Sequence, residues 1–535
     1  MPSSTLTVEA VISKYATSDA CAAELLCDGH DPDAVAFSII EADLSSEDIT
    51  YGQLRERSER AAAALADLGV GPGDTVATLM GKSADLAVML LAIWRRGAIH
   101  VPLFTAFAWP AIELRLIASG ARVVITDADQ LEKLKDSAAT ILVAGDQAKA
   151  PALALTPLLA AQQPGIPAEA VGGDGTLVMI FTSGTTGTPK GVPVPLRALA
   201  AFRQYIELGL DVREDDVFWN AADPGWAYGL YYGILGPLAA GRRSLLLHAG
   251  FSPSLSFAVL ERFKVSNFAA APTVYRTMRS QPENRPKNLM LRRASSAGEP
   301  LTPEVISWAE ETFGVPVRDH YGQTEHGMMI INAWHDDTRQ ELRPGSMGHP
   351  LPGWTCQVLK DGSDELAAPG EMGRVAVDAA ASPMMWFSGY KDAPEKTAER
   401  FSQDGRWYIT GDAGKKDADG YYFFSSRDDD VIIMAGYRIG PFDVESVLST
   451  HPTVLESAVI GAPDELRGEV LEAYVVLNEG VRGDDTLVAE LQKLVKTQFA
   501  AHAFPRRIHF IEALPKTPSG KLQRFILRKQ RAAAQ

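Results

Sequence analysis

Short apolar runs alternate with helix-length amphipathic segments through most of the first 400 residues. Residues 54–70 carry apolar side chains at 3.6-residue spacing and reach a glycine at position 69, residues 75–80 (TVATLM) indicate a strand, and residues 84–97 indicate another helix. The rhythm continues through the runs VVITD, ILVAG, LVMIFTSG and SLLLHAG. Such alternation predicts doubly wound α/β units, whose ligands bind in crevices at the carboxyl ends of the strands.

Two changes of pattern divide the rest of the chain. Between residues 344 and 425, glycine and proline punctuate short strand-like segments such as GEMGRVAVD and DGYYFFSS, which predicts a small β subdomain. After Asp430, strand-like runs (VIIM, ESAVIGA, LEAYVVL) alternate with helical ones, which predicts a compact α+β module. We therefore expect a large N-terminal domain over residues 1–428 and a small, mobile C-terminal domain over residues 429–535.

Composition and charge narrow the classes of function. The 535 residues include 51 Lys and Arg against 67 Asp and Glu, and the net charge of −16 argues against general affinity for nucleic acid or anionic lipid. The longest apolar stretch, residues 86–94, is far shorter than the roughly 20 residues that span a bilayer, and no secretory signal opens the sequence. We expect a cytoplasmic protein without a membrane span, whose three cysteines are reduced thiols.

The segment TSGTTGTPKG, residues 182–191, directly follows the apolar strand LVMIF. Its glycines let backbone N–H groups approach an anion, its hydroxyl side chains add donors, and its lysine adds a charge. It matches neither the P-loop nor the dinucleotide pattern, because its lysine precedes a glycine and its glycines lack G-x-G-x-x-G spacing. We expect phosphate to be held by Thr182, Ser183, Gly184, Thr185, Thr186, Gly187 and Lys190.

Five further motifs follow that loop in a fixed order. They are AGEP (297–300), DHYGQTE (319–325), YITGD (408–412), RDDDVIIMAGYR (427–438) and PKTPSGK (515–521). Together they resemble the adenylate-forming superfamily of acyl-CoA synthetases, firefly-type luciferases and nonribosomal adenylation domains, whose members join a carboxylate to AMP. The resemblance covers residues 51–524, and YGQTEHG and FSGYKDAPEKTAERF look most like the medium-chain acyl-CoA synthetase branch. It implies ATP, Mg²⁺ and coenzyme A as the small molecules used.

The resemblance implies three catalytic residues. Lys521 is expected to reach the carboxylate and the α-phosphate of ATP during adenylation. Thr185 and Glu325 are expected to hold Mg²⁺, a hard cation that prefers oxygen ligands. These residue types suit the reaction, because a carboxylate that attacks a phosphate brings two anions together and needs positive charge to offset them.

The resemblance also implies how the nucleotide is held. Asp412 is expected to accept both ribose hydroxyls, with Arg427 assisting, because a carboxylate can accept two hydrogen bonds at once. Tyr321 offers a flat face to the adenine, and Asp319 would accept from its amino group. The other residues expected around the nucleotide are Gly298, Glu299, Pro300, Gly322 and Thr324.

For the second half of the reaction, the resemblance implies a moving module and a tunnel for the CoA thiol. Asp429 matches the hinge at which the C-terminal module changes orientation. Gly436 matches the point where the pantetheine thiol passes the backbone, and Ala271 matches a wall of that tunnel. Arg438 is expected among the cofactor-binding residues.

The acyl pocket is expected to lack charge. By resemblance its walls are Trp226, Ala227, Tyr228, Ala297 and Gly322. The small residues at 297 and 322 predict an acid larger than acetate, and Gly322 is expected to set chain length, because acetate-specific relatives carry a bulky Trp there. An uncharged aliphatic or aryl carboxylate suits this pocket better than an amino acid.

Other functions remain open at this point. An enzyme that loads a carrier protein, or a luciferase-like oxygenase, would share the adenylating half of the reaction. A serine hydrolase built on Ser296 lacks the first glycine of G-x-S-x-G. The sequence leaves the identity of the acid, the pathway and the oligomeric state undetermined.

Overall fold

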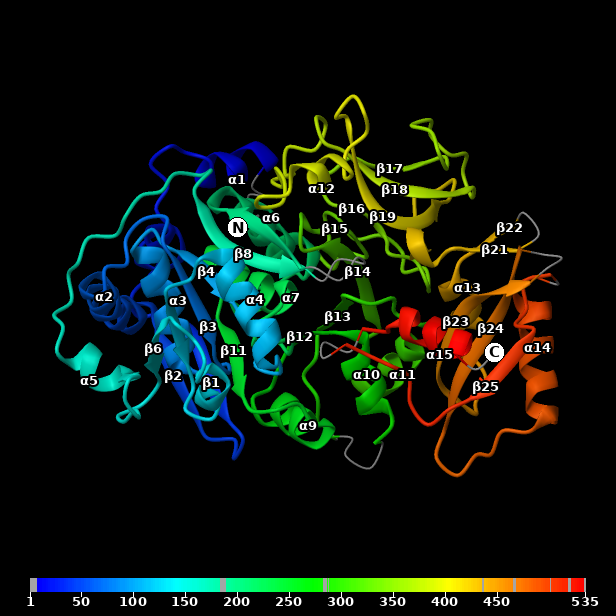
Figure 1. Cartoon of the computed structure of the whole chain (residues 1–535), viewed down its shortest axis with the longest axis horizontal. Coiled ribbons are helices and arrows are strands. Elements are labelled where there is room, and N and C mark those ends of the chain that lie inside the picture. Colours follow the sequence, from blue (N-terminus) through cyan, green and yellow to red (C-terminus); the bar gives the residue numbers. More distant parts are fainter. Residues whose placement is uncertain are drawn as a thin grey trace.

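The computed structural model describes residues 7–182, 189–281, 286, 288–434, 437–464, 468–500, 502–517 and 521–533, with the backbone alone at positions 429 and 438. Within these ranges the strands form four sheets. Three sheets lie before residue 428, and the fourth lies in the C-terminal part, drawn orange to red in Figure 1. The expected mixture of α/β units, a small β subdomain and a small C-terminal α+β unit is confirmed.

A seven-stranded sheet contains the first predicted alternation. Its strands are parallel except for the last pair. In spatial order they are β7 (Leu153–Ala154), β6 (Thr140–Val143), β5 (Val123–Thr126), β3 (Thr75–Leu79), β4 (Ile99–Pro102), β8 (Thr176–Thr182) and β9 (Lys190–Pro195). The helices of this region are α2 (Tyr51–Asp67), α3 (Ala84–Arg95), α4 (Trp109–Ser119) and α5 (Leu155–Ala160).

Helix α3 explains the longest apolar stretch of the sequence. It begins where the Ser83 hydroxyl accepts a hydrogen bond from the Leu86 N–H at 3.2 Å, and residues 86–95 are all buried. The apolar run is therefore a core helix. Among the helices of the described residues, none is long and apolar enough to cross a membrane.

A nine-stranded sheet is parallel in its middle and antiparallel at both ends. Its order is β16 (His349–Pro350), β15 (Gly327–Ile331), β14 (Val317–Gln323), β13 (Arg293–Ala297), β12 (Asn267–Ala270), β10 (Phe218–Asn220), β11 (Ser244–His248), β1 (Val35–Glu41) and β2 (Ser46–Thr50). The helices between its strands are α6 (Leu199–Gln204), α7 (Ala227–Leu230), α8 (Gly236–Ala240), α9 (Pro253–Arg262), α10 (Pro272–Arg279) and α11 (Pro303–Phe313). The first helix of the chain is α1 (Val8–Tyr15).

Two smaller sheets complete the fold. The predicted β subdomain is an antiparallel sheet of β17 (Cys356–Leu359), β18 (Met372–Asp378), β19 (Trp407–Lys416) and β20 (Tyr422–Arg427), with α12 (Pro394–Ala398) between two of its strands. The C-terminal sheet contains β21 (Ile432–Met434), β22 (Tyr437–Ile439), β23 (Val454–Asp464), β24 (Gly468–Leu477) and β25 (Arg507–Phe510). Its helices are α13 (Pro441–Leu448), α14 (Asp485–Gln498) and α15 (Arg524–Ala533).

Side chains of the C-terminal unit contact the rest of the chain at several described positions. The Phe424 and Phe442 rings lie 6.0 Å apart, the Ser425 hydroxyl donates to Asp443 Oδ2 at 2.5 Å, and the Ser449 hydroxyl donates to Glu304 Oε2 at 2.9 Å. These contacts hold the C-terminal unit over the carboxyl ends of β13 and β14, where the α/β pattern predicts a ligand.

Candidate active site

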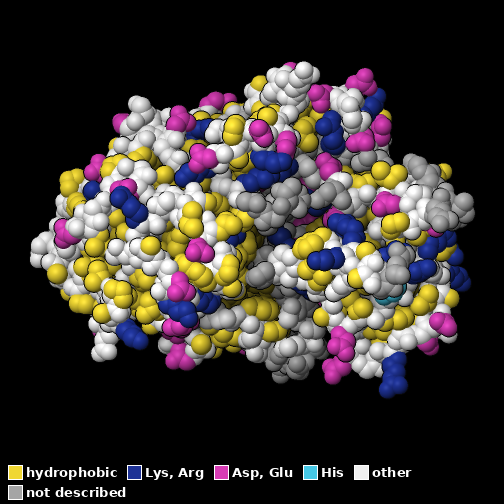
Figure 2. Space-filling model, viewed as in Figure 1, with side chains coloured by type: hydrophobic (Ala, Val, Ile, Leu, Met, Phe, Trp, Pro, Cys, Tyr) yellow, Lys and Arg dark blue, Asp and Glu magenta, His cyan; other side chains and the backbone are white. Residues whose placement is uncertain are grey.

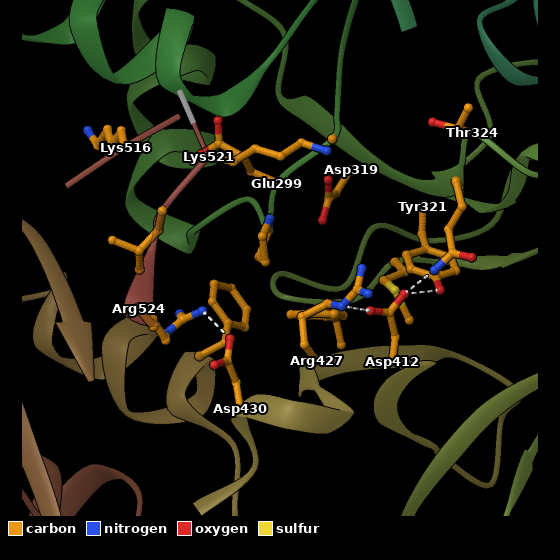
Figure 3. Close-up of a pocket in the computed structure, with 18 of the residues that line it drawn as sticks. Glu299, Asp319, Tyr321, Thr324, Asp412, Arg427, Asp430, Lys516, Lys521 and Arg524 are labelled. Carbon is orange, nitrogen blue, oxygen red and sulfur yellow. Dashed lines mark hydrogen bonds and ion pairs between the residues drawn. The ribbon is translucent and has the colours of Figure 1, made fainter. Parts of the chain in front are cut away.

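A cavity of about 440 Å³ brings the predicted motifs together. Thr182 ends β8 of the seven-stranded sheet, residues 298–300 follow β13, and residues 321–325 end and follow β14 of the nine-stranded sheet. The carboxyl ends of these three strands therefore meet at one cavity. Figure 3 shows side chains from the β subdomain and the C-terminal unit facing them across the cavity. The predicted residues that line it are Thr182, Lys190, Trp226, Ala227, Gly298, Glu299, Pro300, Asp319, Tyr321, Gly322, Thr324, Glu325, Asp412, Arg427 and Lys521.

Some of the predicted residues lie outside the described part of the chain. These are Ser183, Gly184, Thr185, Thr186 and Gly187 of the phosphate loop, Gly436, and the side chains of Asp429 and Arg438. The backbone of Asp429 is described and lies in a short helical turn, Asp428–Asp430, between β20 and β21.

Asp412 is the centre of a polar cluster in the cavity. It is only 3% exposed, and its Oδ2 accepts hydrogen bonds from the Tyr321 hydroxyl at 2.6 Å and from Gln323 Nε2 at 2.7 Å. Its Oδ1 forms an ion pair with Arg427 Nε at 3.3 Å (Figure 3). Sequence reasoning missed Gln323, although it lies inside the DHYGQTE motif.

Asp319, the third residue of β14, lines the cavity. Its side chain accepts backbone N–H groups of Leu301 at 3.4 Å and His320 at 3.1 Å. Burial raises the pKa of this carboxyl to about 8, and these two hydrogen bonds oppose the rise. The cavity therefore contains one carboxyl group that keeps its proton near neutral pH.

Glu299 is fixed by residues that the sequence analysis did not single out. Arg276 Nη2 donates to Glu299 Oε2 at 2.6 Å, and the Thr273 hydroxyl donates to Glu299 Oε1 at 2.7 Å. Both partners lie on α10, so this helix holds the AGEP loop in place. The sequence offers no local signal for the pairing, because 23 residues separate Arg276 from Glu299.

Lys521 reaches the cavity from the C-terminal unit. Its loop is closed by two hydrogen bonds, from Thr517 N to Lys521 O at 2.7 Å and from Lys521 N to Thr517 Oγ1 at 3.0 Å. The side chain extends across the open volume of the cavity (Figure 3), so it keeps accessible surface there while protein surrounds it. Desolvation lowers the pKa of Lys521, and the negative charge of Glu299 is the largest influence that opposes this shift.

Glu325 and Lys190 both contact Tyr390, a residue that the sequence analysis did not single out. Glu325 is 6% exposed, and its Oε1 accepts a hydrogen bond from the Tyr390 hydroxyl at 2.7 Å. Lys190 Nζ lies 4.9 Å from the centre of the Tyr390 ring. Arg400 Nε donates to the same hydroxyl at 3.0 Å. Tyr390 and Arg400 lie in the segment FSGYKDAPEKTAERF, which carried the resemblance without a role for either residue.

The predicted acyl-pocket residues are only partly brought together. Trp226, Ala227 and Gly322 line the cavity. The centre of the Trp226 ring lies 5.3 Å from that of Phe104 and 5.5 Å from that of Phe107. Tyr228 and Ala297 are not among the lining residues. The tunnel residue Ala271 precedes α10 and also lies outside the lining.

The role expected for Gly322 differs from what the structure supports. A Cβ at this position would lie 2.2 Å from the Gly327 carbonyl oxygen, because the register of β14 and β15 shifts between Tyr321 and Gly322 and brings the strands close together. A side chain there would therefore meet backbone before it filled acyl space. Position 322 needs a glycine because two strands lie close together there. The absence of a side chain at this position therefore does not indicate how deep the acyl pocket is.

Comparison with known proteins agrees with this geometry. Residues 28–390 match the family of AMP-binding enzymes, and residues 443–521 match the AMP-binding enzyme C-terminal domain. The acetyl-coenzyme A synthetase of Bacillus subtilis (strain 168) is 36% identical over 498 residues, which cover 90% of this chain and 85% of that protein. The mitochondrial acyl-coenzyme A synthetase ACSM3 of Mus musculus is 34% identical over 475 residues, covering 86% and 80% of the two chains.

Solved structures resemble the whole chain. An acyl-CoA synthetase from Brucella canis is 41% identical with a TM-score of 0.77, over 99% of this chain and 98% of that one. An anthranilate CoA ligase, AuaEII, in complex with anthranoyl-AMP, is 28% identical with a TM-score of 0.88, over 97% and 99%. The chain belongs to the family of AMP-binding enzymes, and the expected class, an acid–thiol ligase of the adenylate-forming superfamily, is confirmed.

Proposed function

We propose that this protein is an AMP-forming acyl-CoA synthetase that activates a short- to medium-chain carboxylic acid, straight, branched or aryl. The observation that carries the proposal is the meeting of Lys521, from the C-terminal unit, with Asp412, Glu325 and Asp319 in one cavity. The apolar side of that cavity, around Trp226 and Ala227, presents no charge to an acyl chain.

In the first step, a carboxylate oxygen of the acid attacks the α-phosphorus of ATP. The bond from that phosphorus to the β-phosphate oxygen breaks, and pyrophosphate leaves with the bonding electron pair. Lys521 offsets the negative charge that collects on the α-phosphate and the attacking carboxylate. Asp412 and Arg427 hold the ribose, and Tyr321 supports the adenine beside Asp319. Thr182 and Lys190 face the phosphates.

Glu325 fits the role of a Mg²⁺ ligand. It is a buried carboxylate that lines the cavity, and its Oε2 accepts no hydrogen bond from any residue that the structure describes. Thr185 is proposed as the second protein ligand. When bound, Mg²⁺ would neutralise phosphate charge and orient the pyrophosphate leaving group.

In the second step, the C-terminal domain, residues 429–535, turns about Asp429 relative to residues 1–428 and removes Lys521 from the cavity. The thiol of CoA then approaches past Gly436 and Ala271, with Arg438 assigned to CoA. Its sulfur bonds to the acyl carbonyl carbon, AMP leaves with the electrons of the broken acyl–oxygen bond, and the thiol proton passes to solvent. Because ATP and CoA are intracellular metabolites, we also propose a cytoplasmic location.

A panel assay tests this proposal. Pyrophosphate release should depend on the acid, should favour uncharged acids over amino acids, and should yield an acyl-CoA when CoA is present. Adenylation that proceeds without any CoA thioester would instead identify a carrier-protein-loading enzyme or a luciferase-like oxygenase. If none of the acids in the panel caused pyrophosphate release, the proposed reaction would be refuted.

A further inference from the structure

The Tyr390 hydroxyl links two charged side chains that line the cavity. It donates to Glu325 Oε1 at 2.7 Å and accepts from Arg400 Nε at 3.0 Å. Arginine can only donate and a carboxylate can only accept, so the direction of this chain of hydrogen bonds is fixed. Burial and the adjacent Glu325 charge raise the pKa of Tyr390, so the phenol keeps the proton that it donates.

Arg400 has no acidic partner within ion-pair distance among the residues that the structure describes. Its Nη1 donates to the Thr410 carbonyl at 3.0 Å, and its Nε donates to Tyr390. None of the described residues accepts a hydrogen bond from its Nη2, and the side chain lines the cavity. A partly buried guanidinium with unused donors, held by neutral oxygens, is suited to an anionic ligand.

Gly411 provides the space for this guanidinium. It has a φ of 73° in the YITGD motif, and a Cβ at that position would lie 2.6 Å from Arg400 Nη1. A glycine here therefore lets the arginine approach the backbone beside Asp412.

Arg400 and Lys190 are two cations that both contact Tyr390. Lys190 lies over the ring at 4.9 Å, and burial, together with the charge of Arg400, lowers the pKa of Lys190. Two cations so close to each other repel, and an anion between or beside them relieves that repulsion. Glu399 and Glu325 oppose this repulsion only in part, because Glu399 also pairs with Lys396 at 2.6 Å and Glu325 accepts from Tyr390.

We infer that Arg400 is a further ligand for the β- and γ-phosphates of ATP, and that Tyr390 is a positioning residue that holds Arg400 and Glu325 in one array. This inference rests on the proposed function in one respect, which is that the anion bound by Arg400 is the polyphosphate of ATP. A nucleotide that lacks those two phosphates makes no use of Arg400. Lys521, by contrast, acts at the α-phosphate and the acid.

Binding measurements on the intact protein test the inference without any acid. Titration calorimetry compares Mg²⁺ with AMPCPP, an ATP analogue that resists cleavage between the α- and β-phosphates, against AMP. Arg400→Met should weaken AMPCPP binding about 10- to 100-fold, as expected for one lost charged contact, and change AMP binding less than about twofold. Arg400→Lys should recover part of the loss.

Tyr390→Phe removes only the hydroxyl and keeps the ring beneath Lys190. It should weaken AMPCPP binding by about 3- to 10-fold and raise the Mg²⁺ concentration needed for half-maximal binding, because Glu325 loses its donor. Matched controls are Arg406→Met, whose arginine pairs with Asp378 outside the cavity, and Tyr421→Phe, whose hydroxyl donates to the Glu341 carbonyl at 2.8 Å. Both controls should bind both nucleotides as the wild type does.

Several results would overturn the inference. Equal weakening of AMPCPP and AMP would give Arg400 a purely structural role, and unchanged AMPCPP binding in Arg400→Met would remove it from the phosphate site. A wild type that binds AMP but not AMPCPP would refute it as well. If the AMPCPP loss is seen but no acid yields pyrophosphate, the inference stands and the proposed function fails.

Discussion

Gly440→Ala should separate the two half-reactions, because this glycine lies at the contact between the C-terminal domain and the β subdomain. A Cβ at position 440 would lie 1.8 Å from Ser425 Oγ and 2.7 Å from the Ser425 carbonyl oxygen. The hydroxyl can rotate away, but the carbonyl belongs to β20. An ordinary contact begins near 3.4 Å, so the domain must retreat by about 0.7 Å.

That retreat displaces Lys521, which reaches the cavity from the C-terminal domain. A misplacement of about 1 Å in a reacting group can cost about 100-fold in rate, so we expect acid-dependent ATP–pyrophosphate exchange to fall by about 10- to 100-fold. Thioester formation from supplied acyl-AMP should change less than about threefold, since the proposed second step takes place in another orientation of the domain.

The assay measures both half-reactions in the same preparation, with thermal melting to check the fold. Gly250→Ala is a matched control, because nothing lies within 4 Å of a Cβ built at Gly250. Adding Ser425→Ala to Gly440→Ala should recover only part of the exchange, because the carbonyl contact persists. Equal losses in both half-reactions, or no loss in exchange, would refute the docking argument.

Three other substitutions give distinct outcomes. Lys521→Ala should reduce pyrophosphate exchange by about 100-fold or more yet still convert supplied acyl-AMP to thioester, and equal losses would contradict two orientations. Gly322→Ala should lower the melting temperature and should reduce kcat/KM for acetate, butyrate and hexanoate by similar factors. If the variant were as stable as the wild type and lost activity only with hexanoate, Gly322 would instead determine the acyl chain length. The Asp319 carboxyl binds its proton more tightly in the folded protein than in the unfolded chain, so the stability that this proton contributes is lost as pH rises from about 4 to 8. The free energy of unfolding of Asp319→Asn, measured in urea titrations, should therefore rise relative to that of the wild type between pH 5 and pH 8. A pH-independent difference would show that Asp319 has an ordinary pKa.

The elements of the fold were predictable because their signals are local. The helix over residues 84–97 and the strand over residues 75–80 are found as α3 and β3, since apolar spacing and the Ser83 cap act over a few residues. The motifs could likewise be placed at strand ends. What the pattern could not give was which side chains pair, because Tyr390 reaches Glu325 across 65 residues of sequence.

Gly322 shows a second limit. A small residue in a pocket motif has two explanations, space for a ligand or close approach of backbone, and the sequence does not separate them. The irregular pairing of β14 with β15 decides between them here, because it turns the Cβ direction of residue 322 toward the Gly327 carbonyl. That bulge depends on the antiparallel partner strand, which the βα rhythm did not predict.

If Asp412 holds the ribose as proposed, its cluster of contacts must rearrange when the nucleotide binds. A carboxylate offers about four acceptor positions, and Tyr321, Gln323 and Arg427 already approach three of them. Two ribose hydroxyls need two positions, so one protein contact must yield. Tyr321 and Gln323 donate at 2.6 and 2.7 Å, whereas Arg427 lies at 3.3 Å with 43% of its side chain exposed. Under the proposed function, Arg427 is therefore the Asp412 contact that the ribose displaces at least cost.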